Sequence, residues 1–323
     1  MDIPKEVKNC LEILQSKKFQ AYIVGGCVRD LLRNKQPNDW DITTNAIPEE
    51  IQKAFELAGF KTFYENSFGT VSIVSQKLEV KSQNCNSKVK NEEIIEITPF
   101  RTEGKYSDKR HPDAVKFVET LEQDLARRDF TVNAIAMGKE SGIRNQELGI
   151  KSQELGIKII DLFNGQEDLK NKIIKAVGEP TERFKEDALR MLRAVRFAVC
   201  LDKNPWSIEE KTKKAIQENS SLLGDIAKER VKEELVKILI SPNGFVGVEL
   251  LRELGLLQYI IPELLEGFGV GQNKHHIYEI YQHNLLSLQY ACKKGFSLEV
   301  RLAALLHDIA KPRTKSGEGN DST

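Results

Sequence analysis

The chain has 323 residues, of which 40% are hydrophobic and 30% charged, and its formal net charge is zero. This length allows two or three domains, and no apolar run approaches the roughly 18 to 20 residues that a membrane span needs. The five cysteines include no CxxC pair, which argues against a disulfide framework or thiolate zinc site and favours a reduced, cytoplasmic setting. Zero net charge argues mildly against a nucleic-acid partner but leaves room for a local basic stripe.

The first half of the chain combines helix and strand patterns. An amphipathic helix opens it, in place of a signal peptide, and a buried strand, "FQAYIVGG", ends in Gly25 and Gly26. The strand patterns "DWDITT", "FGTVSIVS" and "EEIIEITPF" follow, with a helix beginning at Pro48 between the first two. Polar insertions are predicted near residues 76–92 and 140–158, the second containing a duplicated "QELGIK". We predict an α+β head over residues 1–164.

From about residue 165 the pattern is helical. The segments that predict helices are "KEDALRMLRAVRFAVCLD", "AKERVKEELVKILI", "FVGVELLRELGLLQYI", "HHIYEIYQHNLLSLQYACKKG" and "LEVRLAALLHDIAK". The α+β head is therefore expected to lead into an all-α arm, which we divide into a neck over residues 165–238 and a body over residues 239–323.

Three carboxylates are candidates for metal chemistry. On a strand, Asp39 and Asp41 would point to one face while Trp40 and Ile42 pack behind them. Two acids so placed repel each other, but they suit Mg²⁺, a hard cation that shares oxygen ligands with substrate phosphates. Glu96, between two isoleucines, would add a third carboxylate. The alternatives are a chance DxD turn and a solvent-facing strand glutamate.

The glycine pair adds a second feature. Gly25 and Gly26 follow a strand and precede a short helix, so their backbone N–H groups could face an anion. Arg29, one turn into that helix, could donate a charge-assisted hydrogen bond to a phosphate. A glycine pair alone is more often a simple turn, but its combination with the two acids predicts a cradle for a triphosphate beside metal ligands.

Four segments together resemble a known family. "GGCVRDLLRNKQPNDWDITT" resembles the first motif of the class II tRNA nucleotidyltransferases and bacterial poly(A) polymerases, which share a nucleotidyltransferase head of the polymerase β type. "FRTEGKYSDKRHPDAVKFVETLEQDLARRDFTVNAIAM" resembles their flexible loop and second motif. "IIDLFNGQEDLKNKIIKAVGEP" resembles the third motif and "RFKEDALRMLRAVRFA" the fourth, in order within residues 22–198. Asn164 stands where a glycine is usual.

The resemblance implies that Arg128 contacts the nucleotide's phosphates, for which a guanidinium is well shaped. The alternative is that Arg127 and Arg128 form surface or helix-end ion pairs. Asp129 and Asn133 are expected to hold the shape of this segment, or to touch the ribose, without taking part in the chemistry.

In the fourth motif, Asp187, Arg190, Arg193 and Arg196 recur every three residues and would form a slanting stripe on a helix. The resemblance implies that Asp187 and Arg190 read the incoming base, with the other two arginines nearer the phosphates. A carboxylate accepts from the amine of cytosine or adenine, and a guanidinium donates to the adjacent ring acceptor. Uracil and guanine present the reverse pattern. The alternative is a solvated amphipathic helix face.

Near the C-terminus, "YQHN" and "LLHDIAK" resemble the start of an HD domain. There His283, His307 and Asp308 would bind a divalent transition metal. The pattern of that family needs a further aspartate downstream, and the chain ends before a convincing one, so we interpret the region as a truncated HD-like site. Helix packing and capping are the alternative.

The resemblance implies a template-independent nucleotidyltransferase that uses Mg²⁺ to add CCA from CTP and ATP to the tRNA 3′ end, without a membrane partner. The loop over residues 101–112 would help the pocket switch from CTP to ATP. Alternatives are a poly(A) polymerase, an A-only or CC-only enzyme, and an HD-type metal phosphohydrolase with an RNA-binding head; "RHPDAVKF" favours the tRNA enzyme. The basic residues expected to face the tRNA acceptor arm are Lys211, Lys213, Lys214, Lys228, Arg230 and Lys232.

Overall fold

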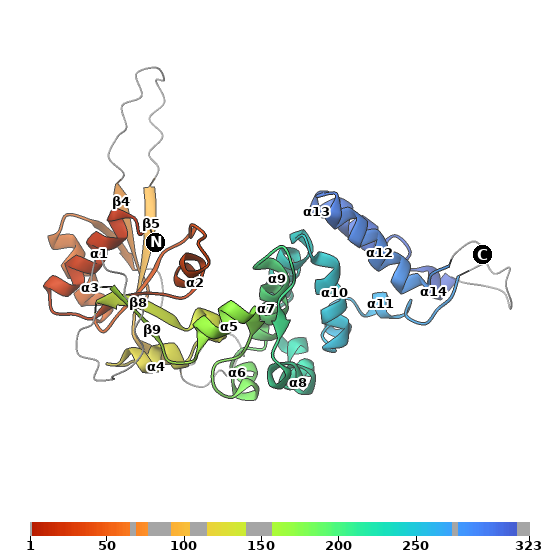
Figure 1. Ribbon diagram of the computed structural model, residues 1–323, viewed down its shortest axis with the longest axis horizontal. Coiled ribbons are helices and arrows are strands. Elements are labelled where there is room, and N and C mark those ends of the chain that lie inside the picture. The colour runs from red at the N-terminus through yellow and green to blue at the C-terminus, as the bar shows by residue number, and fades with distance from the viewer. Residues whose placement is uncertain are drawn as a thin grey trace, which may run out of the picture. The chain divides into compact units, whose positions relative to one another are not determined.

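The computed structural model describes residues 2–64, 69–76, 92–103, 115–139, 157–272 and 277–314. These residues form two compact units, of which the first ends at Asn171 and the second begins at Lys172 (Figure 1). The division of the chain into a head, a neck and a body at residues 164 and 238 remains a prediction.

The first unit combines one large sheet with short helices (Figure 1). Its helices are α1 (Lys5–Ser16), α2 (Gly26–Leu32), α3 (Pro48–Leu57), α4 (Leu121–Ala126), the 3-10 helix η1 (Thr131–Asn133) and α5 (Gly165–Asn171). Its strands are β1 (Ala21–Val24), β2 (Asp41–Thr44), β3 (Lys61–Tyr64), β4 (Val71–Gln76), β5 (Glu92–Pro99), β6 (Arg101–Glu103), β7 (Val115–Phe117), β8 (Ile135–Lys139) and β9 (Ile157–Asp161).

The large sheet has seven strands in the order β3-β4-β5-β2-β1-β8-β9. Strands β2 and β5 are parallel, and the other neighbours in this sheet are antiparallel. Strands β6 and β7 form a separate antiparallel pair. The prediction of an α+β fold with a small mixed sheet is confirmed.

Side chains of β1 alternate between two cores. Ala21 and Ile23 lie in a cluster with buried residues of α1, α2 and α3. Tyr22 and Val24 lie in the other cluster, which includes Phe100 and residues of α4. The sheet is therefore packed on both faces, which explains why β1 is a continuous apolar run.

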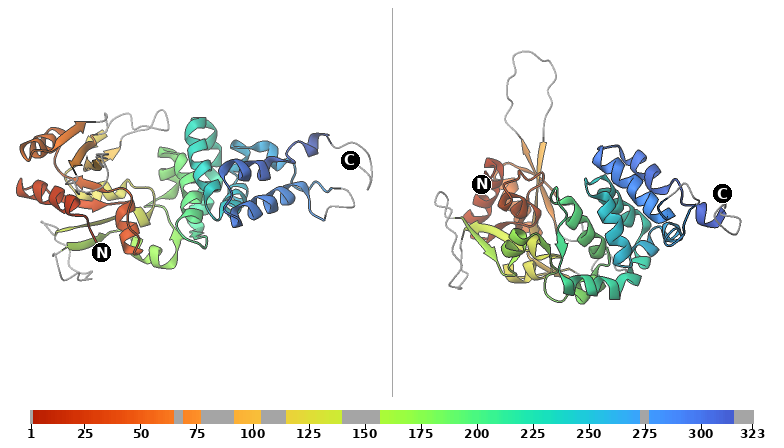
Figure 2. Two further views of the ribbon diagram at one scale, coloured as in Figure 1. Left: turned by 90° about the horizontal axis from the view of Figure 1, so that it is seen from above. Right: turned by 45° about the vertical axis from the view of Figure 1, so that its right-hand side comes forward.

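The second unit is helical apart from a short β-pair, within the described residues (Figure 2). Helices α7, α9 and α10 pack together, and α12 packs against α10 and α13, which confirms the predicted helical arm. The helices are α6 (Pro180–Glu186), α7 (Leu189–Cys200), α8 (Glu210–Asn219), η2 (Ser220–Asp225), α9 (Lys228–Ile240), α10 (Gly244–Glu253), η3 (Leu257–Tyr259), α11 (Pro262–Leu265), α12 (Ile280–Lys293), α13 (Leu298–Leu306) and α14 (Lys311–Thr314), and the strands are β10 (Ile173–Ile174) and β11 (Ser207–Ile208).

Two predicted element boundaries are wrong at site residues. Strand β2 begins at Asp41, so Asp39 precedes the strand. The single helix predicted from residue 185 is divided, because Asp187 is extended, with φ −141° and ψ 105°, between α6 and α7. Its carboxylate Oδ1 accepts the Leu189 N–H at 3.0 Å, a local bond by which aspartate favours a helix start over a helix interior.

The predicted insertions fall mostly outside the described residues. Within residues 76–92 only the ends are described, in β4 and β5, and within residues 140–158 only the start of β9. The proposed switching loop is described only where β6 lies. In the part of the chain that the structure describes, no helix has both the length and the apolar character to span a membrane.

Candidate functional site

Gly25 brings residues of two motifs together. It has φ +80° and precedes α2, and a Cβ there would lie 2.9 Å from Arg128 NH1 and 3.7 Å from Asp41 Oδ2. Any other residue would be strained at this φ and would displace the arginine. The Gly25 N–H donates to the Ile135 carbonyl at 3.3 Å, so the expectation that this group is bare toward an anion is wrong. The fold uses it to extend the contact of β1 with β8.

The acids lie at neighbouring strands. Asp41 on β2 is the register partner of Glu96 on β5, and Ile42 is the partner of Ile97. Because partners on adjacent strands point to the same face, both carboxylates lie on one face and both isoleucines in the core behind it. Glu96 is exposed, so its predicted orientation is confirmed, while its role as a metal ligand remains a prediction.

The electrostatics of Asp41 show that the acids are close. Burial raises the pKa of the Asp41 carboxyl, the Arg128 guanidinium lowers it, and Asp39 raises it further, for a net upward shift. Asp39 therefore lies near enough to repel Asp41 although it is exposed and outside the strand. A partly buried carboxylate with an acidic neighbour is stabilised by a bound cation, so Asp39, Asp41 and Glu96 fit a divalent metal with oxygen ligands.

Arg128 is held by a buried carboxylate that sequence reasoning missed. Asp124, fully buried on α4, accepts hydrogen bonds from Arg127 NH2 at 2.8 Å and Arg128 NH2 at 3.2 Å. Thr43 Oγ1 and the Arg101 N–H each donate to it at 3.4 Å. Burial alone would raise the pKa of Asp124, but the two guanidiniums outweigh it and hold the pKa below its ordinary value. The detectable signal was the i, i+3 and i, i+4 spacing of the aspartate and the arginines.

Arg128 presents one end of its guanidinium to the space at Gly25. The NH2 group is held by Asp124, and NH1 is the atom that lies 2.9 Å from a Cβ built at Gly25. A phosphate oxygen that occupied this space would lie within reach of a charged N–H donor.

Arg29 belongs to a polar network that shapes the second motif. It is buried, donates to Asn133 Oδ1 at 2.8 Å, and forms a two-point ion pair with Asp30. Asn133 in turn donates to Asp129 Oδ1 at 3.1 Å, and the Phe130 N–H donates to the same oxygen. This network agrees with the expected shape-holding role of Asp129 and Asn133. Contact of Arg29 with phosphate remains a prediction.

The predicted stripe of the fourth motif is wrong in part: its three arginines lie on α7, but its aspartate does not. Asp187 lies outside α7, and Arg190 is only 8% exposed, so it is not on a solvated face. Arg190 NH1 donates to Glu186 Oε2 at 2.6 Å. Arg196 Nε lies 3.1 Å from a Glu234 carboxylate oxygen on α9. The guanidiniums of Arg193 and Arg196 lie over the Phe197 ring, 5.3 and 4.4 Å from its centroid.

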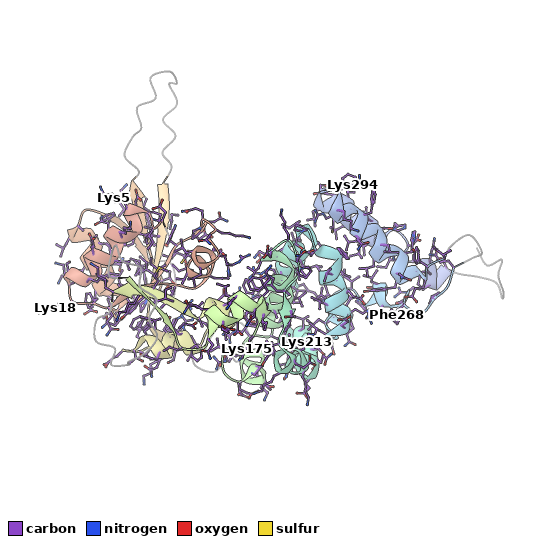
Figure 3. The ribbon with its side chains drawn as sticks, viewed as in Figure 1. Lys5, Lys18, Lys175, Lys213, Phe268 and Lys294 are labelled. Carbon is purple, nitrogen blue, oxygen red and sulfur yellow. The ribbon has the colours of Figure 1, made fainter. Side chains whose placement is uncertain are left out.

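Most of the predicted RNA-binding cations on α8 and α9 have acidic neighbours. Arg230 is the clearest departure from a solvated surface residue, because it is ion-paired to Asp187 at 2.9 Å. Lys228 and Lys232 on α9 are exposed. Ion pairs between exposed side chains, such as those of α8, contribute little stability, so their lysines can exchange the acidic partner for a phosphate. Figure 3 labels one of these lysines, Lys213. The α8 pairs are Lys211–Glu179 at 2.8 Å, Lys213–Glu210 at 4.0 Å and Lys214–Glu218 at 3.8 Å.

The HD-like residues are brought together as expected. His283 Nε2 lies 3.0 Å from His307 Nε2, and Asp308 Oδ2 lies 3.8 and 3.6 Å from those two nitrogens. One ligand atom from each residue lies within 4.8 Å of the others, a spacing that suits a single ion. Lys311 Nζ is 2.7 Å from Asp308 Oδ2 and would compete with a metal.

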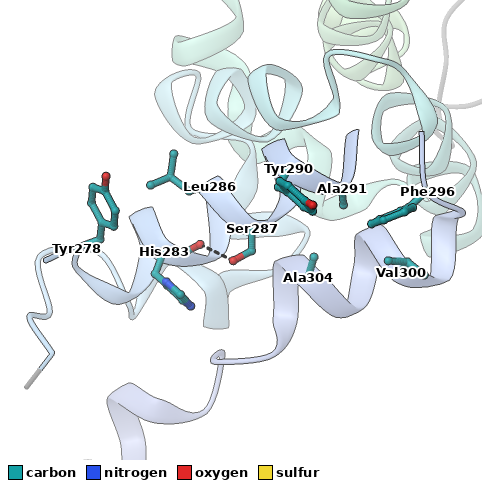
Figure 4. Close-up of a pocket in the computed structure, with 9 residues that line it drawn as sticks. All are labelled: Tyr278, His283, Leu286, Ser287, Tyr290, Ala291, Phe296, Val300 and Ala304. Atoms are coloured by element: carbon teal, nitrogen blue, oxygen red, sulfur yellow. Dashed lines mark hydrogen bonds between the residues drawn. The ribbon is translucent and has the colours of Figure 1, made fainter. Parts of the chain in front are cut away.

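His283 also lines a groove of about 440 Å³ along α12 and α13 (Figure 4). Tyr278, Tyr290, Phe296 and Val300 contribute its apolar surface. The groove and the His–His–Asp cluster therefore share one residue.

Comparison with known proteins finds sequence matches in both units. The profile of the poly A polymerase head domain matches residues 21–175, and that of the probable RNA and SrmB-binding site of polymerase A matches residues 206–267. A CCA-adding enzyme of Lactobacillus helveticus (strain DPC 4571) is 46% identical over 233 residues, which are 72% of this chain and 49% of that protein.

The crystal structure of Bacillus stearothermophilus CCA-adding enzyme in complex with CTP superimposes with a TM-score of 0.65 at 31% identity, covering 98% of this chain and 73% of that one. The chain belongs to the family of CCA-adding enzymes. A tRNA nucleotidyltransferase complexed with a primer tRNA and an incoming ATP analog is 25% identical with a TM-score of 0.60, over 93% of this chain and 75% of that one. The chain spans about half the length of the curated relatives it matches.

Proposed function

We propose that the chain is a template-independent nucleotidyltransferase that adds CCA to the 3′ end of tRNA from CTP and ATP. The observation that carries this proposal is the convergence of Arg128 and Asp41 on Gly25, where a side chain is excluded. Family membership supports the reaction class. The CTP complex of one relative and the primer tRNA complex of another support the substrates.

In this reaction the RNA 3′ hydroxyl attacks the α-phosphorus of the nucleotide, and the bond to pyrophosphate breaks as the new P–O bond forms. Asp39, Asp41 and Glu96 would hold Mg²⁺, which when bound activates the hydroxyl and offsets charge on the leaving pyrophosphate. Arg128 donates from NH1, the atom beside Gly25, to a phosphate oxygen while Asp124 fixes the plane of the guanidinium. The contribution of the protein is mainly positioning and electrostatic stabilisation.

Base choice is assigned to the second unit. Asp187 accepts from the amine of cytosine or adenine, and Arg190 donates to the ring acceptor, while Arg193 and Arg196 serve the phosphates. Asp187 and Arg190 each have an ionic partner within this unit, Arg230 and Glu186. Their side chains are therefore held in defined orientations before a nucleotide binds.

The test is to supply CTP alone, ATP alone, or both to tRNA transcripts that lack all of CCA, only CA, or only the final A. We expect CTP to complete the cytosines and ATP to be added once, to the transcript ending in CC. An A-only enzyme, a CC-only enzyme and a poly(A) polymerase each give a different product ladder. The Asp41→Ala variant, expected to be inactive, controls for contaminating activity.

A second candidate function is that of a metal-dependent phosphohydrolase, favoured by the cluster of His283, His307 and Asp308. Two imidazoles and a carboxylate suit a divalent transition metal, provided that Asp308 leaves Lys311. The test is phosphate release from a small phosphoester with Mn²⁺, Co²⁺ or Zn²⁺. Phosphate release should persist in the Asp41→Ala variant and be lost in the His307→Ala variant. If it is lost in Asp41→Ala and persists in His307→Ala, all activity belongs to the first unit.

A further inference from the structure

The Asp187 carboxylate forms an ion pair with a guanidinium from another helix. Arg230, in the first turn of α9, donates from NH2 to Oδ2 at 2.9 Å and from NH1 to Oδ1 at 3.4 Å. The side chains are 15% and 20% exposed, for Asp187 and Arg230 respectively. A planar fork that contacts both oxygens fixes the rotation of the carboxylate as well as its position.

The hydrogen bonds of Asp187 leave a defined acceptor. A carboxylate has about four acceptor sites, two on each oxygen. Oδ1 uses its sites on the Leu189 N–H and Arg230 NH1, whereas Oδ2 accepts from Arg230 NH2. Among the residues that the structure describes, the remaining acceptor site is on Oδ2, and one N–H of an exocyclic amine would complete this carboxylate.

Helix α9 holds the other end of the motif as well. Glu234 lies four residues after Arg230, hence on the same face of α9, and its carboxylate lies 3.1 Å from Arg196 Nε. Glu234 is only 4% exposed. One face of α9 thus fixes Asp187 before the start of α7 and Arg196 within it.

We propose that Arg230 is a positioning residue for base selection, acting through Asp187, and that α9 is the backing element of the base-reading segment. This inference rests on the proposed function. Arg230 turns Oδ2 of Asp187 toward the base and holds it there, which favours the amine of cytosine or adenine over the carbonyl of uracil or guanine. Without the fork, the carboxylate can rotate away and the carbonyl loses its repulsive neighbour.

The experiment measures kcat/KM for CTP, ATP and UTP with a tRNA primer in the parent, Arg230→Gln, Arg230→Lys, Asp187→Ala and the Asp187→Ala/Arg230→Gln double variant. We expect Arg230→Gln to raise UTP use relative to CTP by about two- to 150-fold, the range that corresponds to the coupling between residues in contact. Arg230→Lys, which keeps the charge but not the fork, should be intermediate. The double variant should match Asp187→Ala, because Arg230 has no effect on selection except through Asp187.

Lys232→Ala is the matched control, since it removes an exposed cation from the same helix. It should leave the UTP-to-CTP ratio unchanged, whatever it does to the KM for RNA. The inference is overturned if Arg230→Gln slows all nucleotides equally or raises only the KM for RNA, as a packing or RNA-contacting residue would. It is also overturned if the effects of the two substitutions add. A parent that adds no nucleotide refutes the proposed function, and this inference with it; a selective parent beside an equally selective Arg230→Gln refutes this inference alone.

Discussion

Asp41 and Glu96 are register partners on the parallel strands β2 and β5, so their carboxylates lie next to each other on one face of the sheet. If both hold the metal, Glu96→Gln should keep the fold and lower nucleotide addition by about ten- to hundredfold, the usual cost of disturbing a metal site near its ligands. Asp41→Ala should abolish the activity. The measurement is single-turnover addition at varied Mg²⁺. The control is Glu12→Gln, an exposed carboxylate on α1; a Glu96→Gln variant as fast as this control removes Glu96 from the metal site.

Asp41→Asn should stabilise the protein at neutral pH while inactivating it. Because the pKa of Asp41 is raised in the fold, its ionised form is disfavoured there relative to the unfolded chain. The favourable contribution of this group is complete below the ordinary aspartate value of 3.8 and is lost as pH rises through the higher folded pKa. Thermal melting should therefore show Asp41→Asn a few degrees above the parent at pH 7, with the gap closing in acid.

The effect of Mg²⁺ on the melting temperature gives a second, independent comparison of the parent with Asp41→Asn. A cation that binds the native state stabilises it by mass action. Mg²⁺ should therefore raise the melting temperature of the parent and have less effect on Asp41→Asn. Equal Mg²⁺ shifts in both proteins would contradict the assignment of Asp41 as a ligand.

Asp124→Asn should be strongly destabilising, because it leaves Arg127 and Arg128 without their buried anion. Removing one partner of a buried ion pair costs about 3–5 kcal/mol. The pKa of Asp124 is lowered in the fold, so its stabilising contribution is present above the ordinary value of 3.8 and is lost as pH falls through the lower folded pKa. Urea unfolding at pH 7 measures the loss. Glu122→Gln, on the same helix, should cost far less; equal costs would mean that the Asp124 cluster does not stabilise the fold.

Sequence patterns predicted those features of the structure that depend on residues close together in the chain. The strand alternation placed Glu96 on the face opposite Ile95 and Ile97, as the structure has it. The departure from the family at position 164 is explained by its backbone: Asn164 has φ +59°, a left-handed conformation that asparagine tolerates better than most other residues after glycine.

The features that could not be predicted depend on contacts between residues far apart in the chain. The register of Asp41 with Glu96 is set by strand order, and the pair of Asp187 with Arg230 by the packing of α7 on α9. Neither leaves a local pattern in the sequence. The helical periodicity continues through Asp187 and predicts a single helix there, whereas the residue has an extended backbone between two helices and accepts the Leu189 N–H.

RNA binding should depend steeply on salt if α8 and α9 contact tRNA phosphates, because each neutralised phosphate releases counterions. Replacing a cation that contacts phosphate should reduce the salt slope by about one. We expect this for Lys228→Ala and Lys232→Ala, which are exposed, and a smaller change for Lys211→Ala, whose ammonium is paired with Glu179. Filter binding of a tRNA transcript from low to moderate salt measures it. Affinity that is constant across this range would exclude the basic face as the tRNA site.

Asp187→Ala should relax base choice more than it lowers the overall rate, because its proposed role is to read an amine and not to bind the metal. The substitution removes the acceptor that favours cytosine and adenine, together with the repulsion that disfavours the O4 of uracil. Loss of one such contact is worth about 1–3 kcal/mol, or roughly tenfold to a hundredfold in relative kcat/KM. Catalysis should persist, because Arg190 is still paired with Glu186 and Arg128 is unchanged.

The quantity that checks this last expectation is misincorporation of UTP and GTP into a transcript that lacks CCA, compared between the variant and the parent at equal primer saturation. Asp225→Ala, a carboxylate of the same unit in η2, controls for the loss of a charge alone. A variant that is simply inactive, or slower but equally selective, would mean that Asp187 orders the start of α7 through the Leu189 N–H. In that case the choice between amine and carbonyl is made by another residue.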